Sequence, residues 1–172
     1  NDGHGNFSRD EAAIPEIMSS GSSVTAADYD QDGDLDLFVS GRLRPHHYPL
    51  SPRSYLLENR EGSFFDVTAE VAPELENIGM ITASLWTDYD NDGMPDLLLC
   101  GEWMPITFMH NEAGKLINRT PQTGLVNTNG WWNSLIAEDF DKDGDLDFVA
   151  GNMGLNTKYK ASEKQPVSLY VK

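Results

Sequence analysis

The sequence predicts an all-β fold, namely a β-propeller segment of about three four-stranded blades. An acidic motif occurs three times, beginning at Asp28, Asp88 and Asp139. Each copy is followed by a short apolar run that ends in glycine: DLFVSG, DLLLCG and DFVAG. Glycine (15) and proline (9) are frequent among the 172 residues, which favours turns and short strands over long helices.

Two further elements recur in step with the acidic motif. An Asn/Gly-containing turn with a strand after it begins at Asn59 (NREGSFFDVT) and Asn111 (NEAGKLINRT), with a looser copy at Asn1. A short strand-like segment precedes this turn in SYLLEN and ITFMHN, and SLYVK at Ser168 resembles it. Each unit therefore has four strands, two beside the acidic loop and two beside the Asn/Gly turn. The helix-like stretch from Thr68 contains proline and is expected to form one turn at most.

These elements divide the chain into blades cut out of register. Residues 1–21 are expected to be the last strand of a preceding blade, 22–80 one blade, 81–130 the next, and 131–172 a blade that lacks its last strand. The segment would then have an unpaired strand edge at each end. Open strand edges favour pairing with another strand, so self-association through these blade edges is expected.

The acidic motif has the pattern D-x-D-x-D-G-x-x-D in all three copies. Alternate carboxylates around a tight turn can converge on one point, and glycine at position six permits the bend. Carboxylate-rich oxygen coordination suits a hard cation, and four carboxylates favour Ca²⁺ over Mg²⁺. We therefore predict about three Ca²⁺ ions. The predicted ligands are Asp28, Asp30, Asp32, Asp34 and Asp36; Asp88, Asp90, Asp92, Met94 and Asp96; and Asp139, Asp141, Asp143, Asp145 and Asp147, with position seven (Asp34, Met94, Asp145) offering only its backbone carbonyl.

The loops are not EF-hands and are not expected to be simple acidic turns. An EF-hand needs a glutamate at position twelve and a helix on each side, whereas position twelve here is Val39, Leu99 or Ala150. The loops hold 14 of the 28 acidic residues, and three Ca²⁺ ions would change the formal charge from −16 to −10. Without a metal, neighbouring carboxylates would repel each other by roughly 1 kcal/mol per pair even in water.

Composition excludes several classes of function. A net charge of −16 with no offsetting basic patch argues against nucleic acid as a partner. No apolar run is long enough for membrane insertion, and no signal peptide is visible. Cys100 is the single cysteine, which excludes a disulfide within this chain and is expected in the core.

The acidic loops and their apolar sequels resemble the FG-GAP repeats of integrin α-subunit propellers, and more closely the bacterial FG-GAP-like or VCBS repeats. GSFFDVTAEVA and GEWMPITFMHNEAGKL resemble the group that is often found with an ASPIC/UnbV domain and is related to cartilage acidic protein. The resemblance covers nearly the whole chain. It implies a partial propeller over residues 1–172, from a parent of about seven blades, with Ca²⁺ in the loop between the first two strands of each blade and a secreted, cell-surface or cell-envelope location.

Other candidate sites are weaker. His46 and His47 lie in a long loop and are expected to be solvated. Arg42, Arg44 and Arg53 lie in or beside that loop and are expected to pair with acids of the calcium loops. Trp103 and the Trp131–Trp132 pair are compatible with a sugar-stacking platform, although aromatic residues of propellers more often fill the space between blades.

No nucleophile elbow, metalloprotease helix, P-loop or dinucleotide fingerprint is present in the sequence. We therefore predict no enzyme and no catalytic residues. The expected function is a calcium-binding extracellular module for adhesion or for binding a protein or glycan ligand, in which Ca²⁺ is structural. The alternative is a polysaccharide-active enzyme domain or its carbohydrate-binding accessory, which would need a pair of carboxyl groups outside the calcium loops.

Overall fold

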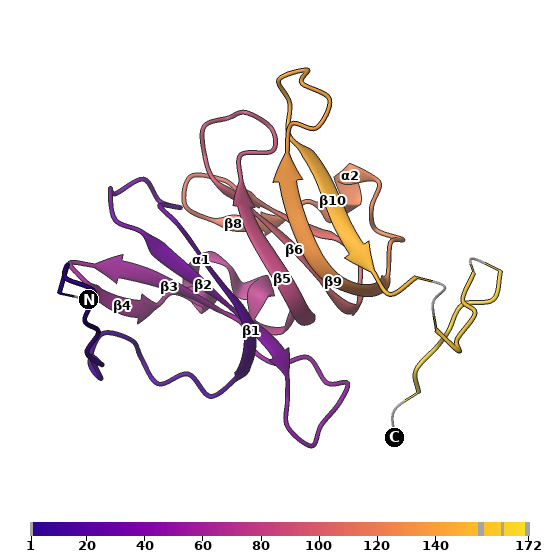
Figure 1. Cartoon of the computed structure of the whole chain (residues 1–172), viewed down its shortest axis with the longest axis horizontal. Coiled ribbons are helices and arrows are strands. Elements are labelled where there is room, and N and C mark those ends of the chain that lie inside the picture. Colours follow the sequence, from indigo (N-terminus) through magenta and orange to yellow (C-terminus); the bar gives the residue numbers. More distant parts are fainter. Residues whose placement is uncertain (1, 155–156, 163, 171–172) are drawn as a thin grey trace.

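A computed structural model describes residues 2–154, 157–162 and 164–170 of the chain. The first sheet is an antiparallel meander whose four strands pair in sequence order (Figure 1). We call it the first unit: β1 (Ser20–Ala27), β2 (Asp36–Leu43), β3 (Tyr55–Arg60) and β4 (Ser63–Asp66).

A second meander follows, and we call it the second unit: β5 (Met80–Thr87), β6 (Asp96–Met104), β7 (Thr107–Asn111) and β8 (Leu116–Asn118). A hairpin comes after the two units and consists of β9 (Gly130–Glu138) and β10 (Asp147–Asn152). It extends the sheet of the second unit through a short contact between β6 and β9. The contact between β6 and β9 consists of two residue pairs, Glu102 with Trp131 and Met104 with Gly130. In contrast, β5 pairs with β6 along almost its full length. The chain therefore builds two complete four-stranded units and one hairpin.

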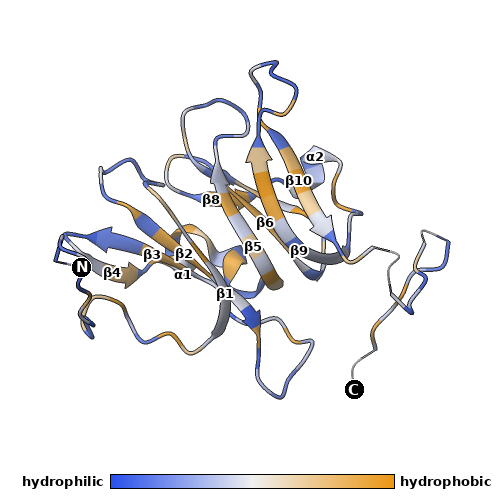
Figure 2. Ribbon diagram, in the orientation of Figure 1, coloured by the Kyte–Doolittle hydropathy of each residue, from blue (hydrophilic) through white to orange (hydrophobic). Residues whose placement is uncertain are grey.

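The apolar runs after the acidic loops form the strands with the deepest burial. In β6 every residue except Trp103 is buried, and Figure 2 shows this apolar strand in the middle of the molecule. A near-continuous apolar run is what a strand covered on both faces requires. Cys100 lies in this run and is fully buried, as expected.

One hydrophobic core joins the two units. Phe38 and Leu56 of the first unit and Leu97, Leu99 and Met109 of the second belong to it. The helices α1 (Thr68–Val71) and η1 (Pro73–Asn77) add Ala72 and Leu75. These two helices exceed the single turn expected from the sequence, and α2 (Thr120–Thr123) was not expected. Of the three, η1 and α2 contain a proline, and Pro73 and Pro121 stand in the first turn, where a missing N–H costs nothing.

Small hydroxyl side chains join the first strands of neighbouring units. The Ser23 hydroxyl lies 2.9 Å from that of Ser84, and the Ser22 hydroxyl donates to the Ile81 carbonyl at 2.6 Å. The Thr82 hydroxyl likewise donates to the Trp132 carbonyl at 2.9 Å. β1, β5 and β9 therefore lie side by side and are held by side chains rather than by a backbone ladder (Figure 1).

The strands that lead into the three acidic loops begin at Ser20, Met80 and Gly130. Two strands expected from the sequence are absent from the described residues. No strand occurs among residues 2–19, where a last strand of a preceding blade was expected, and none occurs over residues 168–170 of SLYVK; residues 1, 171 and 172 lie outside the described part. A strand needs a hydrogen-bonding neighbour, and the N-terminal segment has one such backbone bond to β4, from the Phe64 N–H to the Ala13 carbonyl. Within the described residues, no helix is long and apolar enough to cross a bilayer.

Candidate metal centres

The three acidic motifs form the turns between β1 and β2, between β5 and β6, and between β9 and β10. We call them loops 1, 2 and 3. In Figure 1 loops 2 and 3 project together beyond the upper ends of their strands. The Gln31 side chain of loop 1 donates to the Gly93 carbonyl of loop 2 at 2.8 Å, so these two loops are in contact.

A shared set of hydrogen bonds shapes all three loops. The glycine at position six donates its N–H to the aspartate at position one, at 3.1 Å in loop 1, 2.9 Å in loop 2 and 3.1 Å in loop 3. The N–H at position seven donates to the aspartate at position five, at 2.8–2.9 Å. The carboxylates thus fold the loop around themselves, which is how an alternating acidic sequence becomes a tight turn.

Two positions in each loop have left-handed backbone conformations. The glycine at position six has φ of 88–100°, as expected for a residue that permits the bend. Position four also lies at positive φ, with values of 61° at Gln31, 59° at Asn91 and 65° at Lys142. This second position was not predicted from the sequence, because only Asn91 is of a residue type that favours the left-handed region.

Carboxylate oxygens converge in each loop. Carboxylate oxygens and one imidazole nitrogen that lie within 4.8 Å of one another form groups that can hold a metal ion, and position three belongs to every group. The groups are Asp28, Asp30 and Asp32 in loop 1; Asp88, Asp90 and Asp96, together with Asp90, Asp92 and His110, in loop 2; and Asp139, Asp141 and Asp147 in loop 3. Among the predicted ligands, Asp36 and Asp143 do not join these groups, nor do the side chains of Asp34 and Asp145, which were predicted to act through their carbonyls.

The aspartate at position nine is held by the backbone. Asp36 is fully buried and accepts the N–H groups of Tyr29 at 3.3 Å and Asn59 at 2.8 Å. Asp96 is 1% exposed and accepts from Tyr89 at 3.3 Å and Asn111 at 2.7 Å. Asp147 is exposed and, among the described residues, accepts one backbone N–H, that of Phe140 at 3.1 Å. Position nine therefore fastens its loop to the end of the third strand where such a strand exists.

The Asn/Gly turn completes this fastening. Asn59 accepts the Gly62 N–H and donates to the Leu35 carbonyl, while Asn111 accepts the Gly114 N–H and donates to the Pro95 carbonyl. Asn111 also donates to the Tyr29 carbonyl of loop 1, at 2.7 Å. The repeated asparagine was visible in the sequence, but its contact with the neighbouring loop was not.

His110 distinguishes loop 2. Its Nδ1 atom lies 3.0 Å from Asp96 and 3.4 Å from Asp90. His110 was not predicted from the repeat pattern, because Glu58 occupies the corresponding place in the first unit and pairs with Arg60 instead. Loop 2 therefore carries an imidazole where the first unit carries a carboxylate.

The electrostatics of loop 1 favour a bound cation. Burial raises the pKa of Asp36 to about 6, because its two backbone hydrogen bonds do not offset the lost hydration and the charges of Asp30 and Asp32. Burial also raises the pKa of Asp30. The Oδ1 atom of Asp28 is buried without a hydrogen-bond partner. A cation would supply the missing partner and lower the cost of keeping these carboxylates ionised.

Two of the three arginines, Arg42 and Arg53, differ from their expected role. Arg42 pairs with Glu102 at 2.6 Å, and Arg53 pairs with Asp66 at 2.8 Å and Glu76 at 3.0 Å. None of these partners belongs to an acidic loop, because the arginines lie at the opposite ends of the strands. His46 and His47 are exposed and join no metal-binding group of the described residues.

Residues 88–150 match the family model of the FG-GAP-like repeat. The matched segment begins at the first aspartate of loop 2 and includes all of loop 3. It supports the FG-GAP repeat family for this part of the chain, which is less than half of its length. A comparison with curated proteins gave no match.

Proposed function

We propose that the chain is a calcium-stabilised β-propeller segment that serves as a non-enzymatic ligand-binding module. The clusters of carboxylates in loops 1, 2 and 3 carry the proposal, together with the FG-GAP-like repeat over residues 88–150. The two units and the hairpin would be successive blades, with β1, β5 and β9 as their inner strands. Ca²⁺ would be structural and would fix the turn between the first two strands of each blade.

Calcium would also support the contact between loops 1 and 2. Loop 1 is tied to loop 2 through Gln31, and loop 2 is tied back through Asn111. A cation that orders either loop therefore also supports the contact between the units. Neutralising the carboxylates would remove a repulsion of roughly 1 kcal/mol per neighbouring pair.

Calcium titration followed by thermal and chemical denaturation tests this role. We expect Ca²⁺ to raise the free energy of unfolding, by about 2.7 kcal/mol for each site at a hundred times its dissociation constant. Unchanged melting after addition of a chelator would show that the metal has no structural role. Mg²⁺ at equal concentration is expected to stabilise less, because it requires stricter octahedral geometry.

A matched pair of variants locates the effect. Asp90→Asn changes position three, which belongs to both groups of loop 2, and should weaken the calcium response. Asp34→Asn changes position seven, whose side chain joins no group, and should leave the response unchanged. An equal effect of the two substitutions would indicate a general charge effect rather than a site.

Location, partner and family group complete the proposal. Flexible loop sites of this kind often need calcium near ~0.1–1 mM, which fits a secreted or cell-envelope protein. Adhesion, or binding of a protein or glycan, is the proposed activity, and the group associated with ASPIC/UnbV domains is the proposed subfamily. The buried carboxylate outside the loops, Glu102, is engaged by Arg42 and Tyr48, which favours binding over acid catalysis.

A further inference from the structure

A second surface of the protein lies at the ends of the strands opposite the acidic loops. The glycine that ends each apolar run is followed by a different pair of residues in each unit: Arg42–Leu43, Glu102–Trp103 and Asn152–Met153. Positions that vary within a repeated frame are where repeat proteins place recognition. These positions also meet in space, since Arg42 of the first unit pairs with Glu102 of the second.

A hydrogen-bonded network around the buried Glu102 carboxylate holds the aromatic residues of this surface. Glu102 is 5% exposed and accepts hydrogen bonds from Arg42 at 2.6 Å and from the Tyr48 hydroxyl at 3.0 Å. The Tyr48 hydroxyl in turn accepts the Trp103 indole N–H at 2.7 Å. Each link is satisfied, so the network fixes the orientation of both rings.

Trp103 has an unfavourable backbone conformation. Its φ is 63°, a region that bulky side chains rarely adopt, and it lies at a register shift in the pairing of β6 with β9. It is also the one residue of β6 that is not buried. A bulge of this kind re-aims a side chain, and strain that neighbouring contacts maintain is typical of binding sites.

The aromatic rings face a cavity. Trp103 and Trp131 lie with ring centroids 5.8 Å apart and an interplanar angle of 36°. A cavity of about 1180 Å³ lies between this surface and described residues from Met153 to Leu169, and its lining on this side is Tyr48, Trp103, Trp131, Asn127, Asn129 and Asn152. Tyr48 and the three asparagines are exposed, and both tryptophans are half-buried.

We infer that this surface binds a neutral oligosaccharide. Aromatic rings pack against the C–H faces of pyranose rings, and the asparagine amides can donate to and accept from their hydroxyl groups. The two indoles are too close together to enclose an ammonium group between them, so they form a platform rather than a cage. Glu102 is neutralised by Arg42, and the net charge of −16 disfavours an anionic ligand.

This inference rests on the proposed function in that it assigns the ligand of a binding module, but it does not require calcium. The probes are cellohexaose, chitohexaose and maltohexaose, with choline as a cationic comparison. Binding is measured by calorimetry and tryptophan fluorescence, with calcium and again with chelator. Binding that persists in chelator, without calcium stabilisation, would refute the structural role of calcium and leave this site standing.

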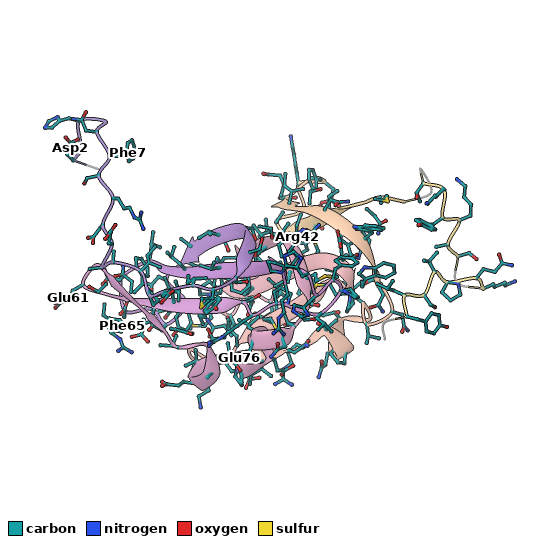
Figure 3. All side chains as sticks on the ribbon, turned by 90° about the horizontal axis from the view of Figure 1, so that it is seen from below. Asp2, Phe7, Arg42, Glu61, Phe65 and Glu76 are labelled. Carbon is teal, nitrogen blue, oxygen red and sulfur yellow. The ribbon has the colours of Figure 1, made fainter. Side chains whose placement is uncertain are left out.

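We expect at least one hexasaccharide to bind, and Trp131→Ala to raise its dissociation constant by roughly tenfold. Trp103→Ala should do the same, and Trp131→Phe, which keeps an aromatic ring, should retain most of the affinity. Phe65→Ala is the matched control, since Phe65 is an exposed aromatic residue far from Arg42 (Figure 3). Thermal melting of each variant separates loss of the site from loss of the fold. Absence of binding for all three hexasaccharides, binding of choline alone, or equal losses for Phe65→Ala and Trp131→Ala would overturn the inference.

Discussion

The aspartates at position nine of the three loops are identical in the sequence but differ in their surroundings. Asp36 and Asp96 are buried and each accept two backbone N–H groups, whereas Asp147 is exposed and accepts one. The difference arises from the third strand, which supplies the second donor only in the first and second units. A residue's contribution to stability therefore depends on its unit as well as on its place in the motif.

Replacing Asp96 with alanine should be far more costly than replacing Asp147. Asp96→Ala leaves the N–H groups of Tyr89 and Asn111 without acceptors in a buried place, at about 1–3 kcal/mol each. Asp147→Ala exposes one N–H to water and should cost about 0.5 kcal/mol or less. Urea denaturation in the presence of chelator measures both variants without a metal contribution. Equal losses would show that the third strand does not create the difference.

Glu102 should give the protein a defined loss of stability in acid. Burial opposes its ionisation, but the hydrogen bonds from Arg42, Trp131 and Tyr48 outweigh burial and lower its pKa below the ordinary 4.5. The unfolded chain therefore takes up the proton first as the pH falls. The stabilisation is complete above the unfolded pKa and is lost as the pH falls through the lower, folded value.

Glu102→Gln tests this sign. At pH 7 we expect the variant to be less stable by about 1–3 kcal/mol, and we expect the gap to the unaltered protein to close in acid below about pH 4.5. Glu16→Gln, at an exposed position, is the surface control. Urea titrations across this range provide the measurement. A gap that widens in acid would contradict the direction of the pKa shift.

Residues within one loop were more predictable than contacts between segments. Asp28, Asp30 and Asp32 could be proposed as one group because alternation around a turn brings them together. His110 lies 14 residues beyond Asp96 in the chain, and the Asn111 contact with Tyr29 spans 82 residues. No local pattern encodes such contacts, because they depend on how the units pack.

At the scale of elements, the strands followed from apolar runs bounded by turn residues. The errors lie where a strand was inferred from likeness to another copy, as in residues 168–170 and in the N-terminal segment. Likeness in sequence does not supply the neighbouring strand that a ladder needs. The short helices after β4 and β8 were underestimated because four- and five-residue elements show no usable periodicity.

Replacing the repeated glycine at the end of each apolar run with alanine should cost more stability in the second unit than in the hairpin of β9 and β10. At Gly101 an added Cβ would lie 2.1 Å from the Met80 carbonyl oxygen, a backbone atom of β5 that cannot move alone. At Gly151 the nearest atom is the Ser134 hydroxyl at 2.4 Å, which can rotate away. We expect Gly101→Ala to cost about 1–3 kcal/mol or more and Gly151→Ala below about 1 kcal/mol. Chemical denaturation compares them, and a larger loss at Gly151 would contradict the close approach of β5 and β6.

At the scale of the whole molecule, the hairpin of β9 and β10 differs from the two units before it. Strand β10 pairs only with β9 among the described strands, so its outer edge is open. Ile136 and Val149 are partners in this pairing and lie on one face, with exposed fractions of 53% and 51%. In the second unit the corresponding positions, Leu85 and Leu98, are half-buried and fully buried. The hairpin therefore presents to solvent a face that the second unit buries.

We expect this face and edge to drive self-association at high protein concentration, because open edges and exposed apolar faces both favour contacts between copies. Light scattering over a concentration series should show a rising apparent mass for the unaltered chain. The double substitution Ile136→Lys and Val149→Lys should keep the protein monomeric, because it places charge where a second copy would pack. Val24→Lys is the matched control, since Val24 is 59% exposed on β1 and away from the hairpin, and it should leave association unchanged. A constant monomer mass for the unaltered chain would rule out association, and an equal effect of Val24→Lys would move the interface away from β9 and β10.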